Sequence, residues 1–483
     1  MTTLLVIFSI SLLISLIITP YIAKLGIIFG AMDEPNERKH HKNPIPRIGG
    51  LSILSSFVLT LCITSFFKTD ISNELIFDKS LTFFFIGAGI TFGIGLFDDF
   101  HQLRAIIKLL FQILGASIAF YGGLKIEFFK LGNIYFHTGI LSYFVTVFWF
   151  VFFINAINLI DGLDGLAAGI VFFACLVLVL LSVLRHEYLI ALLFAALGGS
   201  VLGFLRYNFN PASIFMGDGG SYFLGYAIAG LSIMGKAKSQ LGAAMLIPLI
   251  ALGVPVFDTM IAPLRRFILG KAMFKPDKEH FHHKLIEKGL SAKNAVLYIY
   301  RISIALCILA IVLVNVRNEQ AGLFLIIIGG GTFFFIKKIG YFEYFATDKL
   351  YGWFKDMTDE AGFTKDRRTF LNLQVEISKS ETLEELWKNI CHALNKLDFD
   401  MAELHLNDNT SKVFVWTRDD FNENTDILKK SNFKMELPLF EKKEKNFGML
   451  WLVKDINRSS IGHYTLRRVE HLRRTVIRKL VSS

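Results

Sequence analysis

Long apolar runs recur through the first two thirds of the chain and constrain its fold more than any other feature. A helix needs about 17 or more mostly apolar residues to cross the hydrocarbon core of a bilayer. We identify eleven such runs in the 483 residues, although the run 221–234 is short and rich in glycine. They lie near residues 4–23, 48–67, 81–97, 105–121, 140–157, 166–184, 188–205, 221–234, 241–262, 295–315 and 321–339. Because 53% of all residues are hydrophobic, the sequence predicts a polytopic all-α membrane protein with about eleven transmembrane helices.

The Lys and Arg residues in the short loops predict the orientation of these helices. Eleven spans place the two ends of the chain on opposite sides, and cytoplasmic loops carry the excess of Lys and Arg. The loops of one side hold fifteen of these residues and the loops of the other side hold eight. We therefore expect the N-terminus outside and the C-terminus in the cytoplasm. Positive-inside loops and anionic lipids or substrates account for the net charge of +10, so no nucleic-acid partner is expected.

A polar motif over residues 155–165 separates two of the apolar runs. On a helix, residues three apart lie close to one face, so Asn155, Asn158 and Asp161 begin together until glycines loosen the backbone. Carboxylates are costly inside a bilayer, so we expect the motif at a membrane edge, pointing into a polar site. A helix cap followed by a turn needs one such residue and not four. The motif reads Asn155-Ala-Ile-Asn158-Leu-Ile-Asp161-Gly-Leu-Asp164-Gly165.

Two further acidic motifs fall at the ends of apolar runs on the same predicted side. Asp98 and Asp99 end the third run, and Asp218 lies in a glycine-rich stretch directly before the eighth run. Adjacent carboxylates repel each other, so a cation such as Mg²⁺ suits them, with substrate phosphate as a further ligand. Small residues at a helix start also expose backbone N–H groups to an anion. For Asp98 and Asp99 alone, a solvated helix-capping pair is an equally good interpretation.

Two loops on this side are rich in cations. The loop 32–50 ends in Pro46-Arg47-x-Gly-Gly, and glycines let a backbone approach a ligand closely. For its Lys and Arg residues alone, a positive-inside anchor is an alternative of similar weight. The second loop, after the ninth run, carries Arg265 and Arg266. Asp258, within the ninth run, is either part of a polar lining at that depth or an ion-pair partner of one of these arginines, and we favour the ion pair. We expect a kink at Pro255.

The second loop continues with three histidines, His280, His282 and His283. Three histidines within four residues suggest zinc, but the other candidate ligands nearby are carboxylates and no cysteine is close. We therefore favour hydrogen bonding or stacking to a nucleotide, or contact with a phosphate.

Beyond residue 340 the apolar runs stop, and we predict a linker over 341–370 and a cytoplasmic α+β domain over 371–483. Apolar residues from Leu383 to Leu397 follow helical spacing. Alternating runs at 402–406, 413–416, 433–439 and 448–453 predict strands, and an Arg-rich amphipathic helix is expected over 464–481. This order faintly resembles that of GAF-type sensory modules. The ligand or partner of such a domain is unknown.

Together the motifs resemble the polyprenyl-phosphate N-acetylhexosamine-1-phosphate transferase family over residues 1–340. The His-x-His-His form resembles the WecA and TagO branch, which transfers N-acetylglucosamine-1-phosphate from its UDP-sugar. Two positions depart from the family pattern: Gln102 replaces a third acid, and Lys284 replaces an arginine. The motifs that carry the resemblance are Pro46-Arg47-x-Gly-Gly, Asp98-Asp99, the 155–165 motif, Phe215-Met-Gly-Asp218-x-Gly-Ser221 and His280-x-His282-His283.

The resemblance implies an enzyme of the bacterial cytoplasmic (inner) membrane with its active site on the cytoplasmic face. It would use Mg²⁺, with Mn²⁺ as a substitute, to transfer N-acetylglucosamine-1-phosphate or a related N-acetylhexosamine-1-phosphate from a UDP-sugar to undecaprenyl phosphate. UMP would leave, and the lipid product would start a cell-envelope polysaccharide such as O-antigen or teichoic acid. A homodimer is one assembly that it allows.

The resemblance also implies roles for individual residues. The catalytic set is Asp98, Asp99, Asp161, Asp164 and Lys108. The substrate-binding set is Arg47, Asn158, Asn208, Arg265, Arg266, His280, His282 and His283. Asp218 and Asn158 are the expected metal ligands.

Two other classes of protein stay open at this stage. A polytopic transporter also places carboxylates in a membrane, but its sites lie near the midplane and its halves repeat. Here the polar motifs lie at the ends of spans, and we find no repeat. A membrane-tethered sensor would work through the C-terminal domain, which leaves the five upstream motifs unexplained.

Overall fold

The computed structural model describes most of the chain, with gaps. The described residues are 2–34, 44–66, 73, 75–131, 134–235, 242–268, 280–315, 373–407, 412–418, 432–441, 445–457, 461 and 463–482.

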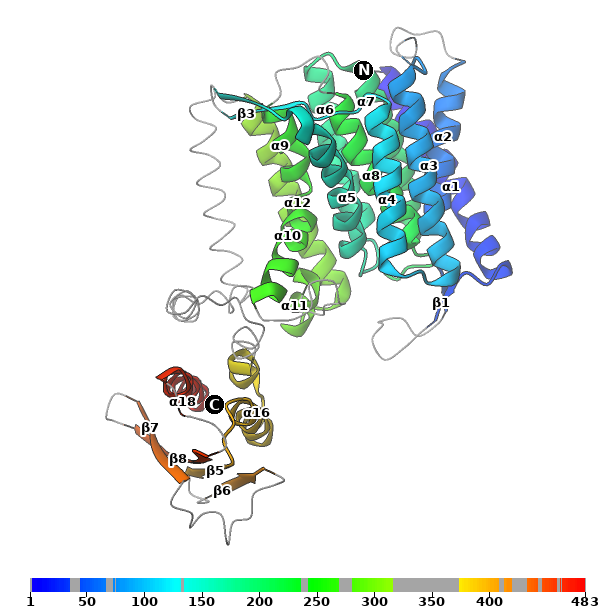
Figure 1. Ribbon diagram of the computed structural model, residues 1–483. Coiled ribbons are helices and arrows are strands. Elements are labelled where there is room, and N and C mark those ends of the chain that lie inside the picture. Colours follow the sequence, from blue (N-terminus) through cyan, green and yellow to red (C-terminus); the bar gives the residue numbers. More distant parts are fainter. Residues whose placement is uncertain are drawn as a thin grey trace. The chain divides into compact units, whose positions relative to one another are not determined.

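A bundle of helices forms the N-terminal part of the chain (Figure 1). Its helices are α1 (Thr2–Ile28), α2 (Gly50–Thr64), α3 (Lys79–His101), α4 (Ala105–Tyr121), α5 (Ser142–Ile160), α6 (Leu166–Leu184), α7 (Tyr188–Asn208), α8 (Gly217–Met234), α9 (Gly242–Ala251), α10 (Gly253–Ile268), α11 (Phe281–Glu287) and α12 (Ala292–Asn315). A short 3₁₀ turn, η2 (Gly139–Leu141), leads into α5.

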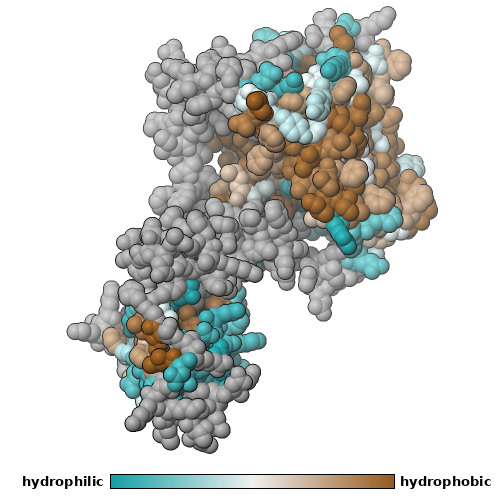
Figure 2. Space-filling model, in the orientation of Figure 1, coloured by the Kyte–Doolittle hydropathy of each residue, from teal (hydrophilic) through white to brown (hydrophobic). Residues whose placement is uncertain are grey.

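Six helical segments in the described part are long and apolar enough to cross a membrane. They are Thr2–Ile28, Lys79–His101, Gly139–Ile160, Leu166–Leu184, Tyr188–Asn208 and Ala292–Val312. Figure 2 shows an apolar surface over the bundle, with hydrophilic residues gathered towards its two ends. The chain is therefore a multi-pass membrane protein. The count of eleven spans and their orientation stay predictions, and the eleventh run, 321–339, lies outside the described residues.

The ninth apolar run, 241–262, forms two helices instead of the single kinked span that we expected. α9 ends at Ala251 and α10 begins at Gly253, so the break precedes Pro255. Pro255 then lies in the first turn of α10, where a missing N–H removes no hydrogen bond within the helix.

The short, glycine-rich eighth run forms α8, which is buried along nearly its whole length. Its glycines explain how it fits between α3 and α5. A Cβ atom added at Gly225 would lie 2.5 Å from Ile154 Cα of α5, and one added at Gly95 of α3 would lie 2.6 Å from the Asp218 carbonyl oxygen. Contacts this close require glycine, so α8 is a tightly packed core helix whose first turn rests on the end of α3.

Two small antiparallel ladders lie in the bundle's loops. β1 (Met32–Asp33) pairs with β2 (Ile45–Pro46), and β3 (Phe128–Leu131) pairs with β4 (Ile134–His137). The first ladder holds the residue after it, Arg47, whose backbone N–H donates to the Ala31 carbonyl at 3.0 Å.

The described C-terminal residues form a small α+β unit. Its sheet has the order β6-β5-β8-β7, with all neighbours antiparallel. The elements are α16 (Leu383–Lys396), β5 (Met401–Leu406), β6 (Val413–Thr417), β7 (Asn432–Glu441), β8 (Lys445–Asp455) and α18 (His463–Ser482). One apolar core joins the sheet to both helices, with Leu394, Leu404 and Leu472 at its centre. The two helices and four strands lie where the sequence predicted them, whereas the likeness to GAF modules stays a prediction.

The chain divides into two compact units, residues 1–262 with 277–341, and residues 263–276 with 342–483. The predicted boundaries at 340 and 370 fall among residues 316–372, which are outside the described part, and stay predictions.

Candidate active site

The candidate site is centred on Asp218, in the first turn of α8. Its Oδ2 accepts hydrogen bonds from Lys108 Nζ of α4 and from the Tyr222 hydroxyl, each at 3.0 Å. Its Oδ1 accepts from Asn158 Nδ2 of α5, also at 3.0 Å. The same Lys108 Nζ donates to Asp98 Oδ2 of α3 at 3.0 Å. Side chains of α4, α5 and α8 therefore meet at this carboxylate, and α3 joins them through Lys108, whose ammonium group lies between two acidic side chains.

Asp99, the neighbour of Asp98, binds backbone groups with both of its carboxylate oxygens. Oδ1 accepts from the Asp218 N–H at 2.8 Å and Oδ2 accepts from the Gly219 N–H at 3.1 Å. A helix start leaves such N–H groups without partners inside the helix, and a carboxylate also interacts favourably with the positive end of the helix dipole. Asp99 thus caps α8 from α3 and sets the position of Asp218.

Arg47 also holds the end of α3 at this junction. Its Nε donates to the Asp99 carbonyl at 2.7 Å, and its second guanidinium nitrogen donates to the Asp98 carbonyl at 2.9 Å. The last carbonyls of a helix lack partners within it, and a cation there is stabilising. The junction requires glycine at position 217 for two reasons. Its φ is +74°, and a Cβ atom there would collide with the Arg47 carbonyl and the Asp99 carboxylate.

Asp161 follows α5 in the turn that leads to α6. Burial raises the pKa of the Asp161 carboxyl well above its usual range, and the negative charges of Asp218 and Asp99 add to the rise. An acid whose ionisation is opposed by neighbouring carboxylates marks a place where a cation would be stabilised.

Asp164 and Asn208, which the family resemblance placed at the site, hold loops together. Asp164 Oδ2 accepts from Asn210 Nδ2 and from the Ala212 N–H, each at 3.0 Å. Asn208 accepts from the Gly165 N–H at 3.1 Å and donates to the Ile214 carbonyl at 3.0 Å. These bonds join the turn after α5 to the loop before α8, which positions both Asp161 and Asp218.

The histidine motif lies beside the 155–165 motif. His280 precedes α11, and its Nδ1 lies 3.0 Å from Asp258 Oδ2. His282 is buried and packs against Gly162 in the turn after α5. The two are so close that a Cβ atom added at Gly162 would lie 2.8 Å from His282 Nε2. His283 contacts His282, with ring centroids 4.2 Å apart. The structure therefore joins two motifs that are more than a hundred residues apart in the sequence.

The expected ion pair between Asp258 and Arg265 or Arg266 lies outside the described side chains. Both arginines belong to α10, but their side chains are not described. Where side chains are described, Asp258 contacts His280.

Sequence reasoning missed Tyr222 and Gln112. Tyr222 lies four residues after Asp218, and this helical spacing alone predicts that the two side chains share a face. Gln112 Oε1 accepts from Asn155 Nδ2 at 2.8 Å, one turn away from Lys108 on α4 and from Asn158 on α5. No sequence signal links the two residues of this pair, because it depends on how α4 packs against α5.

The donor set fits a divalent cation only in part. Among the described residues, no group of three or more His, Cys, Asp or Glu side chains is spaced to hold a metal ion. Asp98 and Asp218 do converge on one ammonium group, however, and Mg²⁺ is commonly held by one or two carboxylates together with substrate phosphates and water. The residues therefore fit a Mg²⁺ ion that a phosphate substrate helps to bind, and not a complete protein cage.

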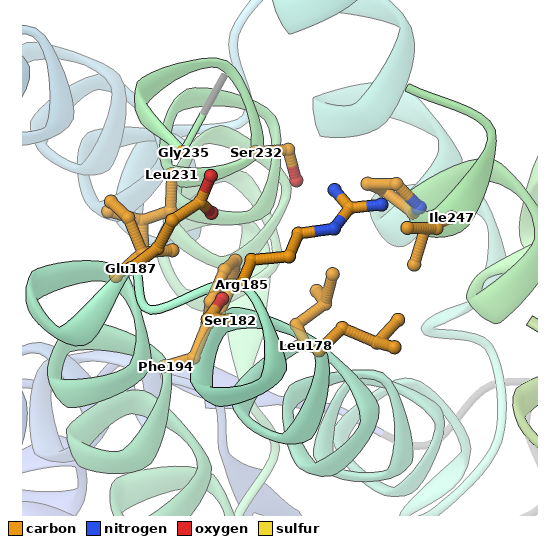
Figure 3. A pocket seen from close by; sticks show the side chains of 12 residues that line it. Leu178, Ser182, Arg185, Glu187, Phe194, Leu231, Ser232, Gly235 and Ile247 are labelled. Carbon is orange, nitrogen blue, oxygen red and sulfur yellow. The ribbon is translucent and has the colours of Figure 1, made fainter. Parts of the chain in front are cut away.

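A separate small cavity lies at the other end of the bundle, where α6 and α8 end. Figure 3 shows the side chains of Arg185 and Ser232 around it, and its volume is about 30 Å³. The residues that line it include none of the predicted site residues. The cavity is thus distinct from the junction around Asp218.

Comparisons with known proteins agree with the geometry. The model of glycosyl transferase family 4 matches residues 81–236, a segment that includes Asp98, Lys108, Asn158 and Asp218. A probable undecaprenyl-phosphate N-acetylglucosaminyl 1-phosphate transferase of Bacillus subtilis is 41% identical over 315 residues, which cover 65% of this chain and 86% of that protein.

More distant relatives carry related names. A decaprenyl-phosphate N-acetylglucosaminephosphotransferase of Mycolicibacterium smegmatis is 33% identical over 307 residues, 58% of this chain and 75% of that protein. An undecaprenyl-phosphate alpha-N-acetylglucosaminyl 1-phosphate transferase of Thermotoga maritima is 32% identical over 257 residues, 53% of this chain and 73% of that protein.

Proposed function

Because the chain belongs to glycosyl transferase family 4, within the WecA and TagO branch of polyprenyl-phosphate N-acetylhexosamine-1-phosphate transferases, we propose that it uses UDP-N-acetylglucosamine and undecaprenyl phosphate. The observation that carries this proposal is the convergence of Asp98, Lys108 and Asn158 on Asp218. Such a junction of carboxylates and a cation suits the neutralisation of phosphate charge during group transfer.

The reaction is a direct displacement at phosphorus. A phosphate monoester has a second pKa of about 6, so the lipid phosphate is mostly ionised near neutral pH and needs no strong base. One of its oxygens attacks the β-phosphorus of the UDP-sugar in line. A new P–O bond forms, the bond between the β-phosphorus and the bridging oxygen breaks, and UMP leaves with that oxygen.

The residues of the junction divide this work. Lys108 balances the charge of the lipid phosphate. Asp98 holds the Lys108 ammonium group in place and so helps to orient that phosphate. Asn158 and Tyr222 hold the Asp218 carboxylate in one orientation, and Asp99 with Arg47 fixes the backbone beneath it. Mg²⁺, when bound by Asp218 and Asn158 with help from Asp98, would neutralise and orient the diphosphate, and Mn²⁺ would substitute for it.

The soluble substrate and the lipid arrive by different routes. UDP-sugars are water-soluble, so the donor enters from the aqueous side. Its diphosphate and nucleotide would be recognised there by His280, His282, His283, Arg265 and Arg266. The lipid phosphate reaches Lys108 from the bilayer. We place this side in the bacterial cytoplasm, and we propose that the lipid-linked product starts a cell-envelope polysaccharide.

An assay with purified protein tests the proposed function. UMP release is measured with undecaprenyl phosphate, Mg²⁺ and a panel of UDP-N-acetylhexosamines. We expect release that depends on the lipid, on the metal and on UDP-N-acetylglucosamine above its epimer. If folded, monodisperse protein releases UMP from none of the donors in the panel, the proposal is overturned.

A further inference from the structure

Asp258 is a buried acid of α10 that the reaction described above does not use. The residue is 2% exposed. Its Oδ2 is 3.0 Å from His280 Nδ1 and accepts a longer hydrogen bond, at 3.4 Å, from the Phe281 N–H. One carboxylate oxygen therefore holds both the side chain of His280 and the first N–H of α11.

The N-terminus of α11 depends on this contact from another helix. His280 is the residue before α11 and makes no capping bond with its own side chain. Initial N–H groups of a helix need acceptors, and a short helix has few hydrogen bonds of its own. Asp258 supplies the acceptor that the local sequence lacks, and so fastens α11 to α10.

The same contact sets the orientation of the His280 ring. The contact joins Asp258 Oδ2 to Nδ1 of His280, so the other ring nitrogen, Nε2, points away from Asp258. The His280 ring stacks in parallel on His282, with centroids 6.0 Å apart and an angle of 8° between the planes. His282 in turn packs on Gly162, next to Asp161.

We propose that Asp258 is a positioning residue for the soluble substrate: through His280 it orients the histidine motif against the 161–165 turn. The inference rests on the proposed function for the identity of that substrate, a nucleoside diphosphate sugar. Asp258 acts on donor binding and not on the lipid, because its described contacts, with His280 and the Phe281 N–H, lead to α11 and through His282 to the turn.

Two variants and one matched control test the proposal. Asp258→Ala removes the acceptor, whereas Asp258→Asn keeps an oxygen that both donors can reach. Asp78→Ala removes another carboxylate that accepts a backbone N–H, at 2.8 Å from Leu81 at the start of α3, away from the site. Asp258→Ala should raise the KM for UDP-sugar about tenfold or more, with the KM for lipid unchanged, and Asp258→Asn should retain most of wild-type behaviour. Asp78→Ala should change neither KM.

A double variant separates positioning from general stabilisation. If Asp258 acts through His280, Asp258→Ala combined with His280→Ala will bind donor no more weakly than His280→Ala alone. Additive losses, or equal changes in both KM values, would overturn the proposal. Calorimetric binding of UDP-sugar without lipid repeats the comparison independently of turnover. Absence of turnover in the wild type would overturn the proposed function, whereas unchanged nucleotide binding in Asp258→Ala would overturn the role of Asp258 alone.

Discussion

Asp218 receives more side-chain hydrogen bonds than its acidic neighbours at the junction, and the first prediction concerns this residue. Asp218→Asn keeps the shape of the side chain but removes its charge, so Lys108 loses one of its two acidic partners and the proposed metal loses its main ligand. We expect turnover to fall by about 100-fold or more, because metal neutralisation of the diphosphate supplies several kcal/mol. UMP release reports the loss, and the thermal unfolding midpoint should stay within a few degrees of wild type. Near-wild-type activity would rule out this role.

The contacts of Asp98 and Asp99 also favour direct displacement over a covalent route. A covalent mechanism needs a carboxylate free to attack phosphorus. Asp99 uses both oxygens on the α8 backbone, and Asp98 is bound by Lys108 and by the Leu103 N–H. We therefore expect no exchange of labelled UMP into UDP-sugar without lipid acceptor. Exchange under these conditions would establish a two-step reaction through an enzyme-bound sugar phosphate.

Residue types and their spacing predicted several side chains that the structure brings together, but they did not predict which contacts each one makes. The acidic motifs were expected on one side of the membrane, and the structure brings Asp98, Lys108 and Asp218 into contact. The sequence could not reveal that Asp99 caps α8 or that Asn208 joins two loops, since both functions depend on which backbone groups packing brings near. The assigned roles stay predictions.

At the scale of helices, the approach of α3 to α8 decides whether the junction can form. Gly95 faces the first turn of α8, where an added Cβ would lie 2.6 Å from the Asp218 carbonyl oxygen. Gly95→Val should therefore push the helices apart, at a cost of about 1–3 kcal/mol in stability, and should sharply reduce turnover. Gly93→Val is the matched control, because nothing lies within 4 Å of its added Cβ. UMP release and thermal unfolding are measured for both, and equal effects would contradict this account.

In the described part of the chain the predicted apolar runs coincide with helices, but hydropathy did not predict how deeply one of them is buried or where another one breaks. The weakest run, 221–234, became the buried helix α8, because small residues lower hydropathy while they permit close packing. The ninth run became α9 and α10, since Gly253 and Pro255 favour a new helix start over a continuous kinked helix. Hydropathy measures transfer into lipid and does not report contacts between helices.

For the whole molecule, composition predicted a polytopic membrane part followed by an α+β domain, and the described C-terminal residues do form an α+β unit with its own apolar core. The strands of the tail were predictable because alternation of apolar residues records a sheet with one buried face. The order β6-β5-β8-β7 was not predictable, because strand order depends on pairing between distant segments.

The last prediction is that the tail is dispensable for chemistry. The first compact unit contains Asp98, Lys108, Asn158, Asp218 and the three histidines. Residues 342–483 belong to the second unit, which has an apolar core of its own. A chain that ends at Phe345 should therefore insert into membranes and keep metal-dependent transfer, with kcat within about threefold of the full chain.

Two kinetic constants distinguish the roles that the tail can have. The segment 263–276, which carries Arg265 and Arg266, groups with the tail in the second unit. If the tail supports this segment, truncation raises the KM for UDP-sugar and leaves the KM for lipid unchanged. If it serves only regulation or partner binding, both constants stay as they are. A truncated protein that is inserted and monodisperse but inactive would show that the tail completes the active site, because a regulatory domain can be removed without loss of the groups that perform the reaction.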